Sequence, residues 1–173
     1  MTGEIHDEHP FAAPVADRDP VRRFRGRLGS PITIITAGDA DGRTGLTVSS
    51  LMVAEGEPSR VFTLIGPTTD LFQAMEETGR FVVHICEDGH GPLADVFAGL
   101  RPSPGGLFID SDVTQTEYGP VLDDLPNRMY CSYLSGEEET YSVLVEGIIE
   151  EVELTELPDP LVYFRGKYRS LAD

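Results

Sequence analysis

The sequence predicts a mainly β protein, in which six or more short antiparallel strands and two or three short helices form a barrel. Three observations support this prediction. The chain has 173 residues, enough for one domain with a sizeable core. Its 18 glycines and 13 prolines are generous for that length and favour many short strands joined by turns. Its apolar segments are short and rich in β-branched residues, and closing their sheet would hide its edges.

The first half of the chain alternates strand patterns with turn signals. Residues 1–20 are polar and interrupted by proline, so we expect a flexible N-terminal arm followed by one domain over residues 21–173. A short helix is expected over residues 22–28. Strands are expected over residues 31–36, 44–52 and 60–65. An Asp-Gly pair between the first two of these strands is a strong hairpin signal.

The second half begins with a change of period. Thr69 or Asp70 would cap the start of a short amphipathic helix, and Gly79 would end it. A second short helix is expected over residues 92–99. Further strands are expected over residues 80–86, 129–134, 141–154 and 161–164.

The formal net charge of −17 restricts the partners of the protein. Nucleic acid and anionic membranes attract clustered Lys and Arg, so neither is expected as a partner. A phosphate-bearing cofactor would need a local basic or amide-lined pocket, because the overall charge repels anions. Two basic stretches could provide one. Residues 18–27 contain five arginines, and Arg165, Lys167 and Arg169 lie together near the end.

The sequence also gives expectations for the cellular location and for the state of the cysteines. No stretch approaches the roughly 20 apolar residues of a membrane span. The acidic start lacks the apolar segment of a signal peptide, so we expect a cytoplasmic protein. The two cysteines, Cys86 and Cys131, do not indicate a disulfide framework. Cys86 ends an apolar run over residues 81–86, which favours a buried free thiol.

The histidines give no metal pattern. His84 lies inside the same apolar run and is interpreted as a core histidine. His90 follows Glu87 and Asp88, but this spacing fits no established zinc site. No metal site is therefore predicted.

Five short motifs, spread over roughly residues 22–170, occur in a recognisable order. They are GLTVSSL (45–51), GRFVVHI (79–85), LADVFA (93–98), GPVL (119–122) and LVYFRGKYR (161–169). Together with the strand over residues 31–36, they resemble the flavin reductase-like family. The resemblance implies an antiparallel split β-barrel of Greek-key type that binds FMN.

The resemblance also implies partners and chemistry. Members are usually homodimers with FMN or FAD at the subunit interface, and many take hydride from NADH or NADPH and pass reduced flavin to a monooxygenase. We therefore expect an NAD(P)H-dependent flavin reductase. Two alternatives stay open: a non-catalytic FMN-binding dimer that stores or senses flavin, and an oxidoreductase that uses a deazaflavin.

The predicted ring site is the segment from Thr47 through Val48 and Ser49 to Ser50. Hydroxyls and backbone groups at this point would suit the polar edge of an isoalloxazine ring. In an alternating strand, Thr47 and Ser49 would face one side and Ser50 the other. From the residues alone, a solvated strand face explains the hydroxyls equally well.

The predicted phosphate site is Pro67, Thr68 and Thr69, at the start of the expected helix. Free amides and the helix dipole favour a phosphate there. Asp70 would compete for the same amides, and simple helix capping is the alternative role for this segment.

Arg165 and Tyr168 complete the predicted cofactor-binding residues. Arg165, together with Lys167 and Arg169, could attract cofactor phosphates or simply offset local acidity. Packing is the alternative role for Tyr168.

Catalytic residues are not predicted, because hydride passes directly from nicotinamide to flavin and the protein supplies geometry and electrostatics. Many family members carry a Gly-Asp-His sequence just before the long strand, and this chain has Thr140-Tyr141-Ser142 there. The missing histidine favours the non-catalytic alternative.

Overall fold

The structure, a computed structural model, describes residues 19–171. The predicted N-terminal arm, residues 1–20, therefore lies almost entirely outside the described residues. Within that range the chain forms three helices and twelve strands. The helices are α1 (Pro20–Arg25), α2 (Asp70–Thr78) and α3 (Gly91–Phe97). The mainly β composition and the short helices agree with the prediction.

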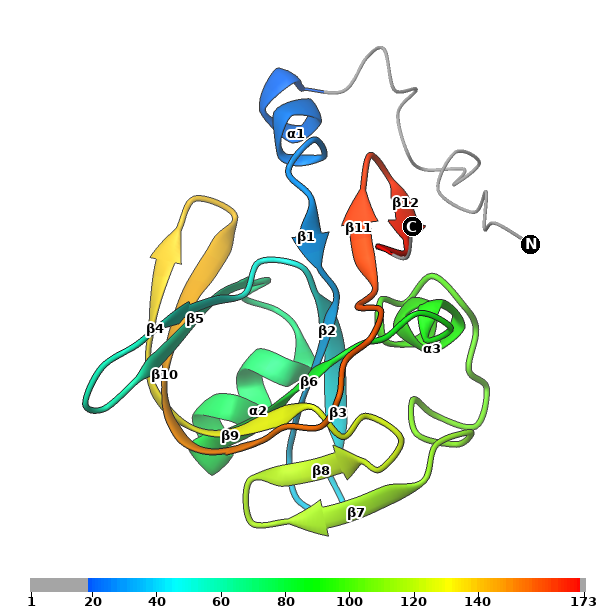
Figure 1. Ribbon diagram of the computed structural model, residues 1–173. Coiled ribbons are helices and arrows are strands. Elements are labelled where there is room, and N and C mark those ends of the chain that lie inside the picture. Colours follow the sequence, from blue (N-terminus) through cyan, green and yellow to red (C-terminus); the bar gives the residue numbers. More distant parts are fainter. Residues whose placement is uncertain (1–18, 172–173) are drawn as a thin grey trace.

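A seven-stranded antiparallel sheet forms the body of the molecule, in the order β3-β2-β6-β9-β10-β5-β4 (Figure 1). Its strands are β2 (Thr33–Ala37), β3 (Thr44–Val48), β4 (Met52–Ala54), β5 (Arg60–Ile65), β6 (Arg80–Ile85), β9 (Arg128–Glu139) and β10 (Ser142–Glu153). The sheet curls but does not close, because no ladder joins β3 to β4. The prediction of a closed barrel was wrong in this respect. The link over residues 49–51 carries the chain from one edge strand to the other.

Two smaller sheets complete the fold. One has the order β1-β11-β12 and consists of β1 (Ser30–Pro31), β11 (Val162–Phe164) and β12 (Lys167–Arg169). The other is a hairpin of β7 (Val113–Thr116) and β8 (Gly119–Leu122). The sequence patterns missed β7 and β8 as strands, and they predicted one strand over residues 44–52 where the structure has two.

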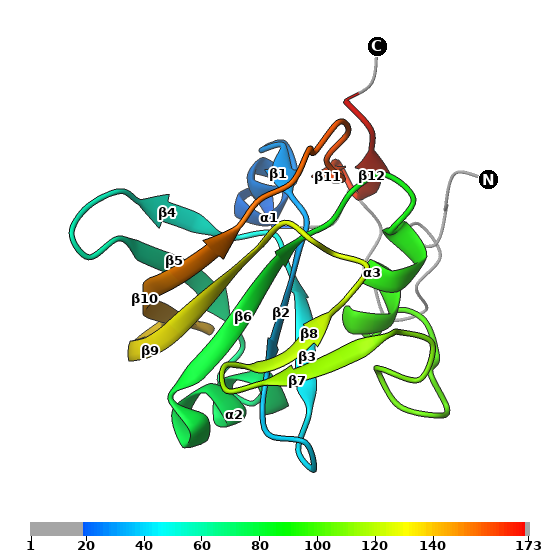
Figure 2. The ribbon, with the colours of Figure 1, turned by 60° about the horizontal axis from the view of Figure 1, so that its bottom comes forward.

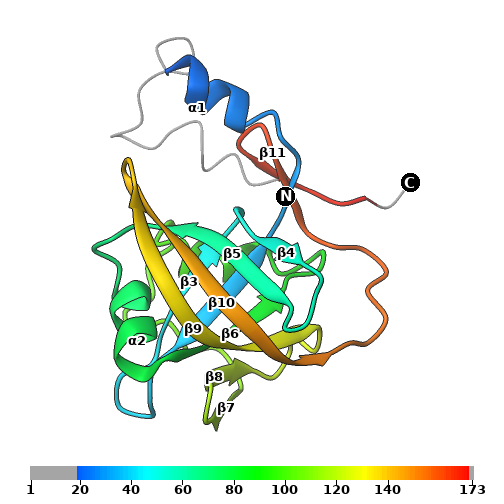
Figure 3. The ribbon, with the colours of Figure 1, turned by 90° about the vertical axis from the view of Figure 1, so that its left-hand side faces the viewer.

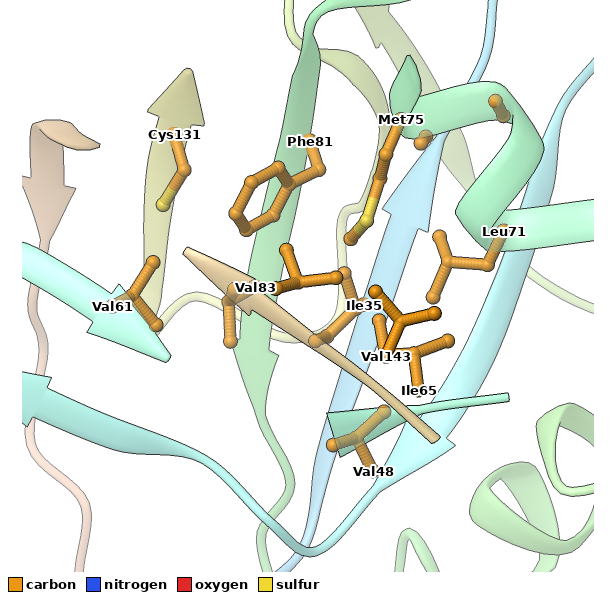
Figure 4. Close-up of a cluster of buried hydrophobic side chains, with 13 residues drawn as sticks. Ile35, Val48, Val61, Ile65, Leu71, Met75, Phe81, Val83, Cys131 and Val143 are labelled. Atoms are coloured by element: carbon orange, nitrogen blue, oxygen red, sulfur yellow. The ribbon is translucent and has the colours of Figure 1, made fainter. Parts of the chain in front are cut away.

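The body has a separate hydrophobic core on each side of β2. On one side, Leu71 and Met75 of α2 pack against Ile35 and Val83 (Figure 4). On the other side, α3 and β8 cover a second cluster. Figure 2 shows α2 and α3 on different sides of the strands between them. Because both faces are covered, β2 is buried along its whole length, as its continuous apolar run predicts.

The first turns of α2 follow from local capping. The Thr69 hydroxyl accepts a hydrogen bond from the backbone N–H of Phe72 at 3.3 Å. Gly79 ends the helix in the left-handed conformation with φ of 69°, which a glycine adopts without the steric cost that other residues meet. Both boundaries agree with the prediction.

His84 connects three strands through its imidazole ring, and the prediction of a core histidine is confirmed. The side chain is fully buried. Its Nδ1 lies 3.0 Å from the Ile34 carbonyl oxygen on β2, and its Nε2 accepts a hydrogen bond from the backbone N–H of Leu122 on β8 at 3.1 Å. A neutral ring with its proton on Nδ1 satisfies both contacts. The ring thereby fastens the β7–β8 hairpin to the main sheet.

The buried ring predicts a loss of stability in acid. Burial above all lowers the pKa of His84 from 6.5 to about 4. The unfolded chain therefore binds this proton near pH 6.5, whereas the folded protein binds it only near pH 4. The neutral His84 ring therefore contributes fully to the free energy of unfolding above pH 6.5. As the pH falls to about 4 this contribution is lost, and the free energy of unfolding drops by about 3 kcal/mol.

Urea unfolding followed by circular dichroism across this pH range tests the prediction. In the His84→Gln variant, an amide oxygen can still accept from Leu122, but no group at this position titrates. We expect the difference in free energy of unfolding between wild type and variant to shrink by about 3 kcal/mol as the pH falls. Parallel pH profiles for the two proteins would contradict the assignment.

Candidate functional site

The open edge of β3 is the first element of the candidate site. β3 pairs with β2 on one side, and within the described residues no strand pairs with its other side. Alternate residues of an antiparallel edge strand direct their backbone N–H and C=O groups away from the partner. The edge therefore presents unpaired donors and acceptors along the strand that ends in the predicted ring segment.

The Ser50 hydroxyl ties the end of this edge to β5. Its Oγ accepts a hydrogen bond from the backbone N–H of Leu64 at 3.0 Å and lies 2.9 Å from Thr63 Oγ1. Since β5 leads directly into the turn over residues 66–69, the two predicted segments become neighbours. Two motifs 20 residues apart in the sequence thus meet at one seam between β3 and β5.

The hydroxyls predicted to face a ring differ in their surroundings. Thr47 Oγ1 donates to the Ala94 carbonyl oxygen of α3 at 2.6 Å, so it positions the helix instead of facing outward. The side chain of Val48 is buried, and its carbonyl accepts from Thr33. Ser49 is exposed and makes no hydrogen bond within residues 19–171. The predicted alternation over residues 47–50 is wrong, because the strand ends at Val48.

The predicted phosphate segment lies at the start of α2. Pro67 and Thr68 are exposed. The Thr69 hydroxyl caps the helix and donates to the Gly66 carbonyl oxygen at 2.9 Å, so the capping alternative is confirmed for this side chain. In the described part of the chain, no hydrogen bond engages the backbone N–H groups of Asp70 and Leu71. These two amides stay available at the positive end of the helix dipole.

Arg165 and Tyr168 form their hydrogen bonds away from the seam between β3 and β5. The backbone N–H of Arg165 donates to the Gly26 carbonyl oxygen at 2.8 Å, beside α1. The Tyr168 hydroxyl donates to Asp95 Oδ1 at 2.8 Å, and the ring packs against the second hydrophobic cluster. A contact between Tyr168 and a cofactor stays a prediction. Burial, together with Asp95, raises the pKa of Tyr168. The residues that sequence patterns predicted as one site therefore fall into two regions.

Helix α3 supports the β3 edge from behind, which the sequence patterns did not predict. Its consecutive residues Ala94 and Asp95 bond to Thr47 and Tyr168, respectively. Gly45 allows the close approach, because a Cβ atom there would lie 2.8 Å from the Phe97 ring. The one available signal was a carboxylate, Asp95, in an otherwise apolar motif.

Other kinds of site have little support among residues 19–171. No three His, Cys, Asp or Glu side chains in this range are grouped to hold a metal ion. His90 has a structural role, because its Nδ1 accepts from the backbone N–H of Glu87 at 3.1 Å. None of the described helices is long and apolar enough to cross a membrane.

Comparison with known proteins places the chain in a family. The flavin reductase like domain matches residues 25–172. The reductase component of 4-hydroxyphenylacetate 3-monooxygenase from Thermus thermophilus is 30% identical over 154 residues, which cover 89% of this chain and 97% of the relative. An NADH-dependent FMN reductase from Ancylobacter novellus is 26% identical and covers 92% and 88%. The chain belongs to the flavin reductase-like family.

Solved structures agree on the fold. The flavin reductase PheA2 superimposes with a TM-score of 0.80 at 24% identity, covering 90% of this chain and all of that one. An NADH:FAD oxidoreductase from Streptomyces globisporus, solved in complex with NAD and FAD fragments, has a TM-score of 0.80 at 19% identity and covers 93% and 96%. At these identities the likeness establishes the shared fold.

The close contact between β3 and α3 makes a prediction. Replacing Gly45 with alanine would place a methyl group 2.8 Å from Phe97 and 3.0 Å from the Ile35 carbonyl oxygen, so α3 must shift. We expect a loss of about 1–3 kcal/mol in the free energy of unfolding, measured in urea. Gly42→Ala, in the turn before β3, is the matched control, since its Cβ would meet only Asp39 Oδ1 at 3.4 Å. Equal losses for both variants would contradict this account.

Proposed function

We propose that this chain is an NAD(P)H-dependent flavin reductase that supplies reduced flavin to a monooxygenase. The observation that carries the proposal is the seam between β3 and β5, where an open strand edge adjoins the start of a helix. Family membership supports the activity. Relatives named as reductase components of monooxygenases support the physiological role.

The groups at the seam fit a flavin. The pyrimidine edge of an isoalloxazine ring carries both hydrogen-bond donors and acceptors, which the unpaired backbone groups of β3 and the exposed Ser49 hydroxyl can satisfy. The free amides of Asp70 and Leu71 suit the flavin phosphate, as helix starts commonly do. The link from Ser50 to Leu64 holds these two parts in one place. The Asp70 carboxylate would have to turn away from the phosphate.

The flavin, when bound, supplies the acceptor for a hydride from NADH or NADPH. The protein's own residues bind and orient both molecules and exclude water. Thr47 and Ala94 fix α3 behind the ring edge. Neither thiol is suited to act as a nucleophile, because burial raises the pKa of Cys86 and of Cys131 to about 12. The proposed cofactors are FMN or FAD, with NADH or NADPH as the co-substrate. We propose a cytoplasmic location, where reduced nicotinamides are available.

A specific observation favours the non-catalytic alternative, in which the protein stores or senses FMN. The segment without the family's histidine, Thr140 to Ser142, comprises the two-residue turn between β9 and β10 and the first residue of β10. Thr140 has a φ of 55°, and Tyr141 is 96% exposed. This turn offers no imidazole toward a nicotinamide.

The outward face of β4, β5 and β10 supports a homodimer. Figure 3 shows these three strands side by side. On their outward face Met52 lies opposite Phe62, and Leu64 opposite Leu144, so four apolar side chains lie on neighbouring strands. Arg60 on the same face bonds Glu146 through Nε, but its Nη1 is buried without a hydrogen-bond partner in the described range. A second copy would cover the apolar groups. We also infer that the two sheet edges define a split barrel of Greek-key type, bridged by Ser50.

Flavin binding and reduction give the direct test. We expect the visible absorbance of FMN to shift saturably when the protein is titrated, and the bound flavin to bleach on anaerobic addition of NADH. A saturable shift that NADH leaves unchanged would replace the reductase by the non-catalytic alternative. The absence of any saturable shift with FMN or FAD would contradict both.

A serine pair locates the binding site in the same titration. Ser49→Ala removes an exposed hydroxyl at the seam, and we expect the dissociation constant for FMN to rise about fivefold, as for one lost hydrogen bond. Ser59→Ala is the control, because its hydroxyl bonds Gly56 in the distant β4–β5 turn. An equal effect of the two substitutions would place the flavin elsewhere.

The apolar face predicts the oligomeric state. We expect wild-type protein to sediment with twice the 18.9 kDa mass of one chain. Leu64→Asp, on a side chain that is 47% exposed, should yield monomers because it places a carboxylate in the interface. Ile109→Asp, at a 61% exposed position before β7, should remain dimeric. A monomeric wild type, or a dimeric Leu64→Asp variant, would contradict the proposed interface.

A further inference from the structure

The charges of this protein are separated in space. Residues 28–164 contain 24 Asp and Glu against five Arg, a net charge of −19. Two short segments at the ends of this stretch are basic. Residues 20–28 contain four arginines and no acid, and residues 162–171 contain two arginines, one lysine and no acid. Those seven cations are Arg22, Arg23, Arg25, Arg27, Arg165, Lys167 and Arg169.

The two basic segments form one structural unit, which we call the basic lobe and define as residues 20–28 and 162–169. The strand pairing of Ser30 with Tyr163 and the hydrogen bond from Arg165 N–H to the Gly26 carbonyl oxygen hold them together. Figures 1 and 3 show α1 projecting from the body beside β11. None of its seven cations forms an ion pair with a residue of the described chain. Among the described residues, no ion pair therefore offsets the positive charge of the lobe.

The lobe also exposes apolar groups. Val21, Phe24 and Leu28 follow a spacing of three and four residues and are 73%, 66% and 54% exposed. Helix α1 has no buried residue. Six residues are too few for a stable isolated helix, so a packing partner is needed to make α1 persistent. Arginines interleaved with an aromatic and aliphatic stripe are the composition of protein interfaces.

The body of the same protein offers a complementary surface. The acidic hairpin, residues 134–141, consists of the end of β9 and the turn into β10, and it contains Glu137, Glu138 and Glu139, all exposed. It also exposes two large apolar groups, Leu134 at 47% and Tyr141 at 96%. The acidic hairpin and the basic lobe lie at the same end of the molecule, yet no hydrogen bond or ion pair joins them among the described residues (Figures 1 and 3).

We propose that the basic lobe of one chain docks on the acidic hairpin of a second copy. Charge and apolar composition match on the two surfaces, and a two-fold axis would form the contact twice. The inference rests on the proposed homodimer and adds a second contact at the edge of its apolar face. Helix α1 projects from the body, and the lobe carries exposed apolar groups, which suits a protein surface better than a small anionic ligand.

Disulfide capture between differently tagged chains tests this contact. Chains carrying Phe24→Cys are mixed with chains carrying Tyr141→Cys. The dimers are dissociated to monomers and allowed to reassociate, so that mixed dimers form, and the sample is then oxidised. Only a contact between chains can then join the new cysteines, because the native Cys86 and Cys131 are buried. We expect a covalent heterodimer that carries both tags. Chains with Ile109→Cys in place of Tyr141→Cys are the matched control and should give little product.

The outcomes separate this inference from the proposed function. A non-covalent dimer that binds FMN but shows no cross-link above the Ile109→Cys control would overturn the docking and leave the reductase intact. A monomeric wild type would overturn the docking and the homodimer together. Binding of the lobe to vesicles containing anionic lipid, abolished by changing its arginines to glutamine and without any cross-link, would assign the lobe to a membrane surface instead.

Exchange of charge gives a second, independent readout. Arg22, Arg23 and Arg25 changed to Glu should raise the dimer dissociation constant at low salt, and Glu137, Glu138 and Glu139 changed to Lys should do the same. Combining both sets in one chain should restore much of the affinity, since opposite charges again face each other. If the combined variant dimerises no better than either single set, the docking is wrong.

Discussion

The unpaired edge of β3 is the constraint on which the rest of the structure depends. A sheet that closed completely would leave no backbone group for a ligand, and an edge open to water would invite pairing with another chain. In this protein the edge of β3 stays open, and specific side chains satisfy the backbone groups next to it. The Ser50 hydroxyl satisfies the end of β5 where a strand would otherwise do so. The proposed flavin would take the remaining positions.

Helix α3 makes this edge rigid. Thr47 bonds Ala94, and Tyr168 bonds Asp95, so adjacent residues of one helix connect the edge strand to the C-terminal hairpin. Gly45 lets the Phe97 ring come within contact of the strand. The C-terminal hairpin in turn holds α1 through Arg165. One continuous set of contacts therefore joins the proposed flavin site to the basic lobe, which we infer contacts the second subunit.

Features set by local chemistry were predictable from the sequence, and features set by distant partners were not. The limits of α2 follow from Thr69 and Gly79, which act within a few residues of themselves. Strand β8 was not predicted from the sequence, because it is held in place by a hydrogen bond to His84, which lies 38 residues earlier. The hydroxyls of the ring segment looked equivalent in sequence, but Thr47 faces a carbonyl of α3 and Ser49 faces solvent. The family resemblance pointed to residues 47–50 as a whole. Only the fold shows that the individual residues of this segment differ in their surroundings.

Amide hydrogen exchange with and without FMN tests the central claim most directly, because it reports on the backbone groups themselves. The account predicts that saturating FMN slows exchange of the outward-facing amides of β3 and of the Asp70 and Leu71 amides, while the amides of the β7–β8 hairpin keep their rates. Saturable FMN binding that protects other segments and leaves β3 and the start of α2 unchanged would show that the open edge is not the flavin site.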